Sequence, residues 1–365
     1  MSVKKHPSGN WQARWRDEYG KQRAKFFDTK KEAERHVENM RVDIRRGEAT
    51  AVVGKITMAA LADQWIDAGV HLAPGTIRTY ERDLRLYILP TFGDLQVGRM
   101  MPALIQKWIA TELKRLAPSS VHRHYRTLRT LLGYAVNQGY LLNNPCDKVN
   151  APRIPRREME TFTVEQIEAI AAAVNPRYRC FILIAAYGGL RWSELVGLRR
   201  MDINGARLTV AGQLLNFDGE WVRSDPKTSA GRRTLILPES VAEELAQHLA
   251  TFTGPKPHDL VFTNRDGYPI GPSFRHNVWY PACASIGMGK RTIKNYKPAY
   301  EDMPRFHDLR HTSVALAIAA GAHPKAIQQR LGHSSIAVTM DRYGHLMAGM
   351  DEDLAADIDA LRSAK

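Results

Sequence analysis

Cysteine is scarce in this chain of 365 residues, which carries only three, namely Cys146, Cys180 and Cys283. They lie far apart and form no CxxC pair, so neither a zinc site of standard spacing nor a disulfide framework is expected. Each is instead expected to be a small core residue in a reducing cytoplasm. No cluster of carboxylates or of Cys and His has the spacing of metal ligands, so the sequence predicts neither a metal nor another cofactor.

Long apolar runs are also missing from the sequence. Lys4 and Lys5 are not followed by an apolar stretch, which argues against a secretory signal. The most apolar run, residues 180–187, is far too short to cross a bilayer. The chain is therefore expected to work in the cytoplasm without a membrane partner.

Acidic residues are in deficit, with 38 Asp and Glu against 52 Lys and Arg, which leaves a formal net charge of +14. Such a charge favours a polyanionic partner, most simply nucleic acid, although a basic surface alone does not demand one. The content of 44% hydrophobic and 25% charged residues is typical of globular proteins. The length is enough for two or three domains with cores of their own.

Residues 1–50 are predicted to form a small domain of β-strands closed by a helix. Trp11, Ala13 and Trp15 alternate with polar residues, which is the period of a half-buried strand, and a second strand follows at 22–27. A basic two-stranded ribbon can enter the major groove of DNA, although the same charges also suit a solvated surface. The candidate DNA-binding residues on these strands are Arg14, Arg16, Arg23 and Lys25.

Residues 57–150, which follow a linker at 48–55, are predicted to form an all-helical domain. One helix opens at Pro74 and ends at Pro90, and the next opens at Pro102. A later helix has an apolar stripe made by Val121, Tyr125, Leu128 and Leu132. Basic residues lie off this stripe and give candidate DNA contacts at Arg123, Arg126 and Arg129.

Residues 161–365 are predicted to form a mixed α/β domain that is mainly helical. An extended basic linker at 151–160, with candidate DNA contacts at Arg153 and Arg156, precedes it. The sequence predicts a buried helix that stops at Gly188 and further helices at 304–320 and 347–361. Short antiparallel strands are predicted at 208–212, 221–225 and 233–237.

An ordered set of polar residues in this last domain suits phosphodiester chemistry without a metal. The set is Arg191 after Gly188-Gly189, the His-x-x-Arg pair His307 and Arg310, His333 after Gly332, and Tyr343. Guanidinium groups can give parallel hydrogen bonds to phosphate oxygens and stay protonated. Imidazoles can exchange protons, and a phenol can act as a nucleophile.

The spacing also suggests how the histidines divide the work. His307 and Arg310 are three residues apart, so on a helix they share a face and can address one phosphate. We expect His307 to take the proton of Tyr343 or to donate to an oxyanion, and His333 to bind a phosphate oxygen. His311 is expected only to support the helix.

The pattern resembles the tyrosine recombinases, the family of phage integrases. Positions of the family's catalytic pattern are matched by Arg191, Lys227, His307, Arg310, His333 and Tyr343. Glu194 matches a commonly acidic position that orients site residues, and His333 stands where some members carry Trp. The resemblance implies that Lys227, in a hairpin between two strands, protonates the leaving 5′ oxygen.

The resemblance also implies a domain plan and a function. It assigns residues 1–50 to an arm-type DNA-binding domain, 57–150 to a SAM-like core-binding domain and 161–365 to the catalytic domain, whose acidic tail helix links protomers. The implied enzyme is an integrase that works through a 3′-phosphotyrosyl intermediate, without metal or ATP, to integrate and excise phage or mobile-element DNA in a bacterial host. Its implied partners are core and arm attachment sites, three further copies in a tetramer, a host DNA-bending factor and an excisionase.

Three other functions are compatible with parts of the pattern. A resolvase of chromosome or plasmid dimers uses the same chemistry, but simple resolvases lack the basic N-terminal domain. A type IB topoisomerase relaxes one duplex as a monomer, whereas a recombinase joins two marked sites. A DNA-binding protein without catalysis forms no covalent adduct and leaves the spacing of the six polar residues unexplained.

Overall fold

The computed structural model describes residues 2–16, 22–45, 56–154, 160–217, 219–226, 229–294 and 296–344, and also residues 355, 359, 362 and 363. These residues divide into two compact units, Met1–Arg156 and Arg157–Lys365. Several features expected from the sequence lie outside the described residues: the linker at 48–55, Arg156, Lys227, most of the tail at 347–361 and the side chain of Arg16.

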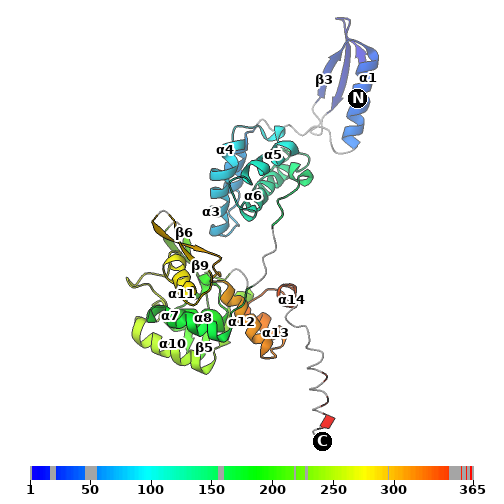
Figure 1. Ribbon diagram of the computed structural model, residues 1–365. Helices are drawn as coiled ribbons and strands as arrows, with labels where there is room; N and C mark the ends of the chain where they lie inside the picture. The colour runs from blue at the N-terminus through cyan, green and yellow to red at the C-terminus, as the bar shows by residue number, and fades with distance from the viewer. Residues whose placement is uncertain are drawn as a thin grey trace. The chain divides into compact units, whose positions relative to one another are not determined.

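The first unit begins with a three-stranded antiparallel sheet in the order β1-β2-β3, followed by a helix (Figure 1). The elements are β1 (Ser2–Lys5), β2 (Trp11–Arg16), β3 (Gln22–Phe27) and α1 (Lys30–Arg45). Ala13 of β2 shares a small core with Ala33 and Val37 of α1. Strand β1 was not expected, because its sequence Ser-Val-Lys-Lys has one apolar residue and therefore no periodic signal.

The rest of the first unit is helical. Its helices are α2 (Met58–Asp67), α3 (Pro74–Asp83), α4 (Leu89–Phe92), α5 (Pro102–Glu112) and α6 (Pro118–Asn137), with a π-helical turn at Leu84–Ile88 and 3-10 turns at Val97–Arg99 and Pro145–Lys148. The expected apolar stripe of α6 is buried in one core with residues of α2 and α5, and this core also holds Cys146.

Pro90 does not end a helix, contrary to the prediction. It lies in the first turn of α4, directly after the π-helical turn. Proline lacks an N–H group and its ring collides with the carbonyl one turn earlier, so it normally breaks a helix. The wider π turn shifts that carbonyl, and the chain stays helical from Pro74 to Phe92.

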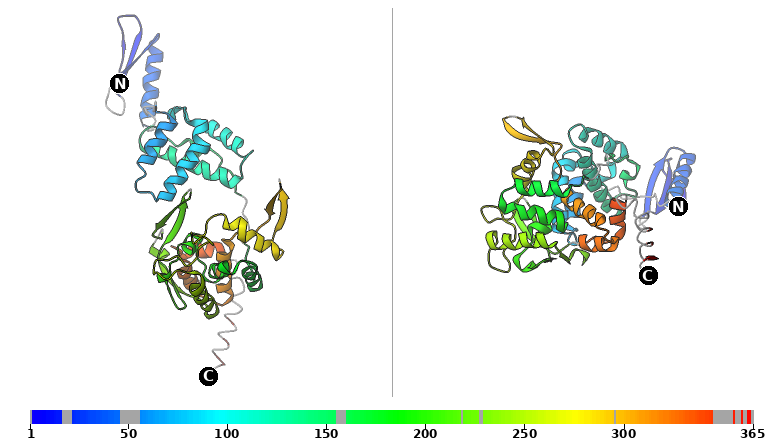
Figure 2. Two further views of the ribbon diagram at one scale, coloured as in Figure 1. Left: turned by 90° about the vertical axis from the view of Figure 1, so that its left-hand side faces the viewer. Right: turned by 60° about the horizontal axis from the view of Figure 1, so that its bottom comes forward.

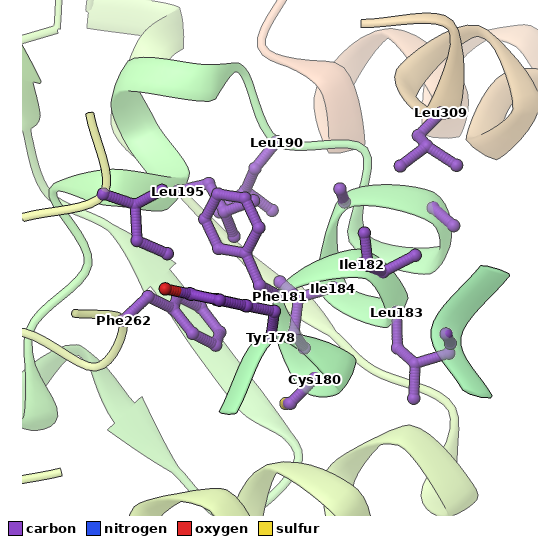
Figure 3. Close-up of a cluster of buried hydrophobic side chains, with 14 of the residues drawn as sticks. Tyr178, Cys180, Phe181, Ile182, Leu183, Ile184, Leu190, Leu195, Phe262 and Leu309 are labelled. Carbon is purple, nitrogen blue, oxygen red and sulfur yellow. The ribbon is translucent and has the colours of Figure 1, made fainter. Parts of the chain in front are cut away.

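The second unit is built around α8, a helix that is apolar on nearly every side. Its helices are α7 (Val164–Ala173), α8 (Pro176–Gly188), α9 (Trp192–Val196), α10 (Glu239–Phe252), α11 (Tyr280–Ser285), α12 (Asp308–Ala319), α13 (Pro324–Leu331) and α14 (Ile336–Tyr343), with a π-helical turn at Arg275–Trp279 and 3-10 turns at Arg200–Asp202 and Ser229–Gly231. Phe181 of α8 is fully buried and packs edge-on against Phe262 (Figure 3). Because packing on nearly every side holds α8 in place, the residues at both of its ends are held in place as well.

Three small antiparallel sheets flank these helices. Their strands are β4 (Ile203–Asn204), β5 (Arg207–Val210) and β8 (Arg233–Ile236) in the first, β6 (Gln213–Phe217) and β7 (Glu220–Ser224) in the second, and β9 (Lys290–Lys294) and β10 (Lys297–Glu301) in the third. The three expected strands are present as β5, β7 and β8, but β7 pairs with β6 in a sheet of its own. The β9–β10 hairpin, which was not expected, extends from α11 (Figure 2).

The helix expected at 304–320 begins later, at Asp308. The carboxylate of Asp308 accepts hydrogen bonds from the backbone and the side chain of Arg305, which closes a turn ahead of the helix. His307 is therefore the residue that precedes α12, and it keeps helical backbone angles, with φ −66° and ψ −19°. No helix in the described ranges is long and apolar enough to span a membrane.

Candidate active site

Arg191 is placed by the end of α8. Gly189 follows this helix in the left-handed region, at φ 66°, and a Cβ atom there would lie 2.7 Å from Oγ of Ser313. Both the backbone conformation and the close approach require glycine. The chain then turns so that Arg191 precedes α9, and its side chain keeps 40% of its surface exposed.

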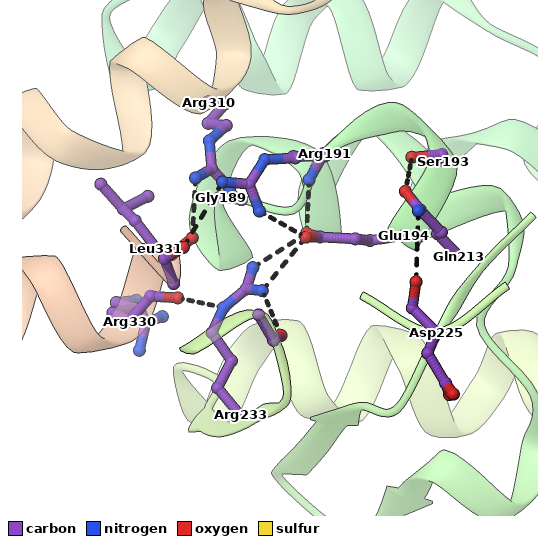
Figure 4. Close-up of polar contacts among 12 residues, drawn as sticks. Gly189, Arg191, Ser193, Glu194, Gln213, Asp225, Arg233, Arg310, Arg330 and Leu331 are labelled. Carbon is purple, nitrogen blue, oxygen red and sulfur yellow. Dashed lines mark hydrogen bonds and ion pairs between the residues drawn. The ribbon is translucent and has the colours of Figure 1, made fainter. Parts of the chain in front are cut away.

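Glu194 is a buried carboxylate that binds two guanidinium groups (Figure 4). Its Oε1 accepts from Nη1 of Arg191 at 2.7 Å and from Nη1 of Arg233 at 3.2 Å. Its Oε2 accepts from the backbone N–H of Arg191 at 2.8 Å and from Nη2 of Arg233 at 2.9 Å. Burial raises the pKa of Glu194, but the hydrogen bonds and charges of Arg233 and Arg191 outweigh burial and hold that pKa below its ordinary value. The charged carboxylate can therefore orient Arg191.

Three successive carbonyl groups at the end of α13 each accept a hydrogen bond from a different arginine. The pairs are Arg330 O with Nε of Arg233 at 2.6 Å, Leu331 O with Nη2 of Arg310 at 2.7 Å, and Gly332 O with Nη2 of Arg191 at 3.4 Å. The last carbonyls of a helix lack intrahelical partners, and the negative end of the helix dipole attracts cations. The end of α13 thus gathers the three arginines into one site.

Arg310 is the most deeply buried of these arginines, and its Nη1 also donates to the carbonyl of Gly189. Burial, followed by the positive charges of Arg191 and Arg233, lowers the pKa of Arg310 to about 9 despite the opposing charge of Glu194. The cluster holds three guanidiniums and one carboxylate, which leaves two positive charges in excess. Such a cluster is electrostatically suited to bind an anion such as a phosphodiester.

Gly332 and His333 follow α13 directly. Gly332 adopts the left-handed conformation at φ 64°, and a Cβ atom on it would lie 2.8 Å from the carbonyl oxygen of Ala230. The backbone N–H of His333 donates to the carbonyl of Gln328 at 3.1 Å, and the Gln328 amide donates to the carbonyl of His333 at 3.0 Å. The position of His333 is therefore fixed relative to the arginine-binding end of α13.

Tyr343 is the last residue of α14 and is buried in a small apolar cluster with Val314, Ile318, Ile327 and Leu331. Its Oη lies 2.5 Å from Nδ1 of His311, a hydrogen bond whose direction depends on the histidine tautomer. His311 was expected only to support its helix, and the structure instead places it against the phenol.

His307 lies beside this pair, with its ring 5.3 Å from the ring of His311 and nearly perpendicular to it. Although part of the ring is exposed, loss of water around the rest, followed by His311 and the charge of Arg310, lowers the pKa of His307 to about 4. The ring is therefore neutral at neutral pH and can accept a hydrogen bond.

Hydrogen bonds thus join Arg191 to Glu194, hold Arg191 and Arg310 at the end of α13, and join His311 to Tyr343. Lys227 lies outside the described residues. Sequence reasoning missed Arg233, which a strand pattern could have revealed. Along β8 the buried positions alternate with exposed ones, and Arg233 occupies a buried position in line with Leu235.

The candidate DNA-binding residues of the first unit fall into two groups. Arg123 and Arg129 form ion pairs within the helical domain, with Asp83 at 3.2 Å and Asp147 at 2.7 Å. These two arginine side chains are exposed, and so are the other candidates whose side chains the structure describes: Arg14, Arg23, Lys25, Arg126 and Arg153.

Comparison with known proteins assigns a family to the helical domain and to the second unit. Residues 160–349 match the model of the phage integrase family, and residues 57–113 match the N-terminal SAM-like domain of phage integrases. The integrase of Mycobacterium phage D29 is 30% identical over 314 residues, which cover 84% of this chain and 79% of that protein.

Solved structures show the same fold. The Tn1549 transposon integrase in complex with a circular intermediate DNA matches 84% of this chain and 99% of its own, with a TM-score of 0.69 and 22% identity. The lambda integrase tetramer bound to a Holliday junction matches 91% of this chain and 95% of its own, with a TM-score of 0.60 and 16% identity.

In the described part of the chain, no group of three His, Cys, Asp or Glu side chains is arranged to hold a metal ion.

Proposed function

The chain belongs to the phage integrase family and is a site-specific tyrosine recombinase, and from this we propose that Tyr343 is the nucleophile that cuts its DNA sites. The phenol oxygen attacks the scissile phosphorus, the bond from phosphorus to the 5′ oxygen breaks, and a 3′-phosphotyrosyl ester forms. The 5′ hydroxyl of another strand then attacks this ester and releases Tyr343. Because each step exchanges one phosphoester for another, the reaction needs no ATP.

The observation that carries this proposal is the position of Tyr343 in the same unit as the arginine cluster. Leu331 joins the two, because its side chain packs with Tyr343 while its carbonyl accepts from Nη2 of Arg310. A phosphate held by the arginines would therefore lie near the residue that attacks it. The hydrogen bond with His311 keeps the phenol oxygen at the polar side of its apolar cluster.

The remaining side chains supply charge and protons. Arg191 and Arg310 bind the non-bridging oxygens and stabilise the charge that develops on them, a role that metal ions fill in other phosphoryl-transfer sites. Neutral His307 is able to accept the phenol proton, and His333 donates to a phosphate oxygen. Lys227, by its match to the family pattern, protonates the leaving 5′ oxygen.

The proposed partners are those that membership of the integrase family suggests. The chain acts on double-stranded attachment sites as a homotetramer and exchanges strands between two duplexes. It uses its N-terminal β-module, which consists of β1, β2, β3 and α1, at distal arm sites. A host DNA-bending factor and an excisionase set the direction of recombination, which inserts and excises phage or mobile-element DNA. The lambda integrase tetramer on a Holliday junction, which shares the fold, supports this assembly.

The test uses a nicked suicide substrate, in excess EDTA and without nucleotide. Wild-type protein should form a covalent adduct, whereas Tyr343→Phe should bind the same DNA and form none. Tyr280→Phe is the matched control, because this tyrosine of the same unit packs on Tyr300 and should not affect the reaction. An adduct with Tyr343→Phe would show that another residue attacks, and a need for magnesium or ATP would refute the mechanism.

A further inference from the structure

Every nitrogen of the Arg233 guanidinium donates a hydrogen bond, although no step of the proposed reaction uses this residue. Its guanidinium is buried and makes four hydrogen bonds: from Nε to Arg330 O at 2.6 Å, from Nη1 to Gly231 O at 3.1 Å and to Glu194 Oε1 at 3.2 Å, and from Nη2 to Glu194 Oε2 at 2.9 Å. These acceptors lie in different directions, which a planar guanidinium can satisfy and a lysine ammonium cannot.

Glu194 shows what Arg233 does for the phosphate-binding residues. Each oxygen of this carboxylate accepts one hydrogen bond from Arg191 and one from Arg233. Without Arg233, the whole negative charge of Glu194 would act on Arg191. Arg191 would then be drawn toward the carboxylate and its charge would be less available to a phosphate.

The second anchor of Arg233 is the end of α13. Its Nε binds the carbonyl of Arg330, which immediately precedes the carbonyls that receive Arg310 and Arg191. Figure 4 shows Arg191 and Arg233 on Glu194, and Arg310 on the carbonyls of Gly189 and Leu331. Arg233 therefore ties the strand that carries it both to the carboxylate and to the helix that orders the site.

We propose that Arg233 is a positioning residue for DNA cleavage, which shares the charge of Glu194 and thereby keeps Arg191 oriented toward the scissile phosphate. The inference rests on the proposed function. It assigns to Arg233 no direct contact with DNA, so a change there should slow cleavage at saturating protein without weakening the binding of DNA.

The first experiment compares Arg233→Lys with wild type in single-turnover cleavage. We expect the rate to fall about 10- to 100-fold, less than the roughly 100- to 1000-fold typical for loss of a direct oxyanion donor. The affinity for the core site should stay the same. Arg179→Lys is the matched control, since Arg179 binds the carboxylates of Glu168 and Glu244 away from the site and should leave the rate unchanged.

The second experiment separates positioning from folding. A methylphosphonate at the scissile position replaces one charged non-bridging oxygen with a methyl group, so cleavage depends less on Arg191. The defect of Arg233→Lys should shrink on this substrate. An equal defect on both substrates would mean that Arg233 only stabilises the fold, and it would overturn the proposal.

A bridging sulfur in place of the 5′ oxygen gives a second contrast, because a thiolate leaves without a proton. A defect that disappears only on this substrate would place the effect of Arg233 on the leaving group and would equally overturn the proposal. A wild-type protein that cleaves none of these substrates would instead refute the proposed function.

Glu194→Gln provides an independent check if Arg233→Lys is poorly folded. Glutamine keeps the shape of Glu194, but its amide nitrogen cannot accept hydrogen bonds, so Arg191 and Arg233 should lose a shared acceptor and cleavage should slow as well. Combined with Arg233→Lys it should slow cleavage little further, because both changes act through one contact. Fully additive effects of the two changes would contradict the shared role.

Discussion

At the scale of single residues, the site depends on two histidines with different surroundings. His307 has a pKa lowered to about 4, so it is neutral in the free protein at neutral pH. The negative charge of a bound phosphate would raise that pKa and favour uptake of a proton. His311 instead contacts Tyr343 directly, at 2.5 Å. His307 is therefore suited to exchange a proton at the phosphate, and His311 to hold the nucleophile.

Replacing His311 tests this division. His311→Phe should slow cleavage about 100-fold or more, within the range by which one acid–base or orienting group typically contributes, because the phenol loses its hydrogen-bond partner. DNA affinity should not change, since the proposed role of His311 is to hold Tyr343. Rates of adduct formation at saturating protein would measure the effect.

The control for this variant is His276→Phe, which changes an exposed histidine of the same unit. It should leave the rate of adduct formation at the wild-type value. If His311→Phe also cleaved at that value, the contact with Tyr343 would be irrelevant to the reaction.

At the scale of elements, two helix ends position the reactive residues. Both α8 and α13 end at a glycine in the left-handed region, Gly189 and Gly332, and Arg191 and His333 follow within two residues. The Gly-Gly-Leu-Arg and Leu-Gly-His motifs were therefore readable as helix stops from the sequence. The acceptors of the arginines were not, because the carbonyls at the end of α13 meet them only through tertiary packing.

Gly332→Ala should reduce both stability and cleavage. A Cβ atom there would lie 2.8 Å from the carbonyl oxygen of Ala230 and 3.1 Å from Nη1 of Arg233, so the end of α13 has to shift. We expect a loss of more than about 2 kcal/mol in the free energy of unfolding, because strain and collision add to each other. Denaturant unfolding and adduct formation would be measured together.

Gly205→Ala is the matched control for this change. Gly205 also has a positive φ, of 56°, but no atom lies within 4 Å of its would-be Cβ. It should cost only about 1 kcal/mol of backbone strain and leave the cleavage rate unchanged. Equal effects of the two substitutions would show that the contact with Arg233 does not matter.

Other elements show where local sequence signals fail. The period of two residues in β2 and the apolar stripe of α6 were read correctly, because each is buried on one face only. Pro90 predicts a helix stop, but the π turn before it, with Leu84 and Ile88 buried in the core, accommodates the proline, and the sequence gives no local signal for such a turn. The composition of β7 and β8 predicts both strands, but not their sheets: β7 pairs with its chain neighbour β6, whereas β8 pairs with β5, which lies before that hairpin in the chain.

At the scale of the whole molecule, the net positive charge and the hydrophobic cores are divided between the N-terminal β-module and the rest of the chain. Residues 1–55 contain 14 Lys and Arg and 8 Asp and Glu, so they supply +6 of the formal net charge of +14. The core of the N-terminal β-module and the core of the helical domain share no residue. Each part can therefore keep its own fold when the other is removed, and the remaining chain stays basic enough to bind DNA.

Deleting residues 1–55 should therefore spare adduct formation at an isolated core site but impair recombination that depends on distal arm sites. The arginine cluster, Tyr343 and the helical domain remain intact, whereas the β2–β3 ribbon with Arg14, Arg23 and Lys25 is lost. Footprints of the full-length and truncated proteins on a complete attachment site would measure the difference, and we expect only the arm protections to disappear. Identical footprints would show that the N-terminal β-module has a structural role and does not read arm sites.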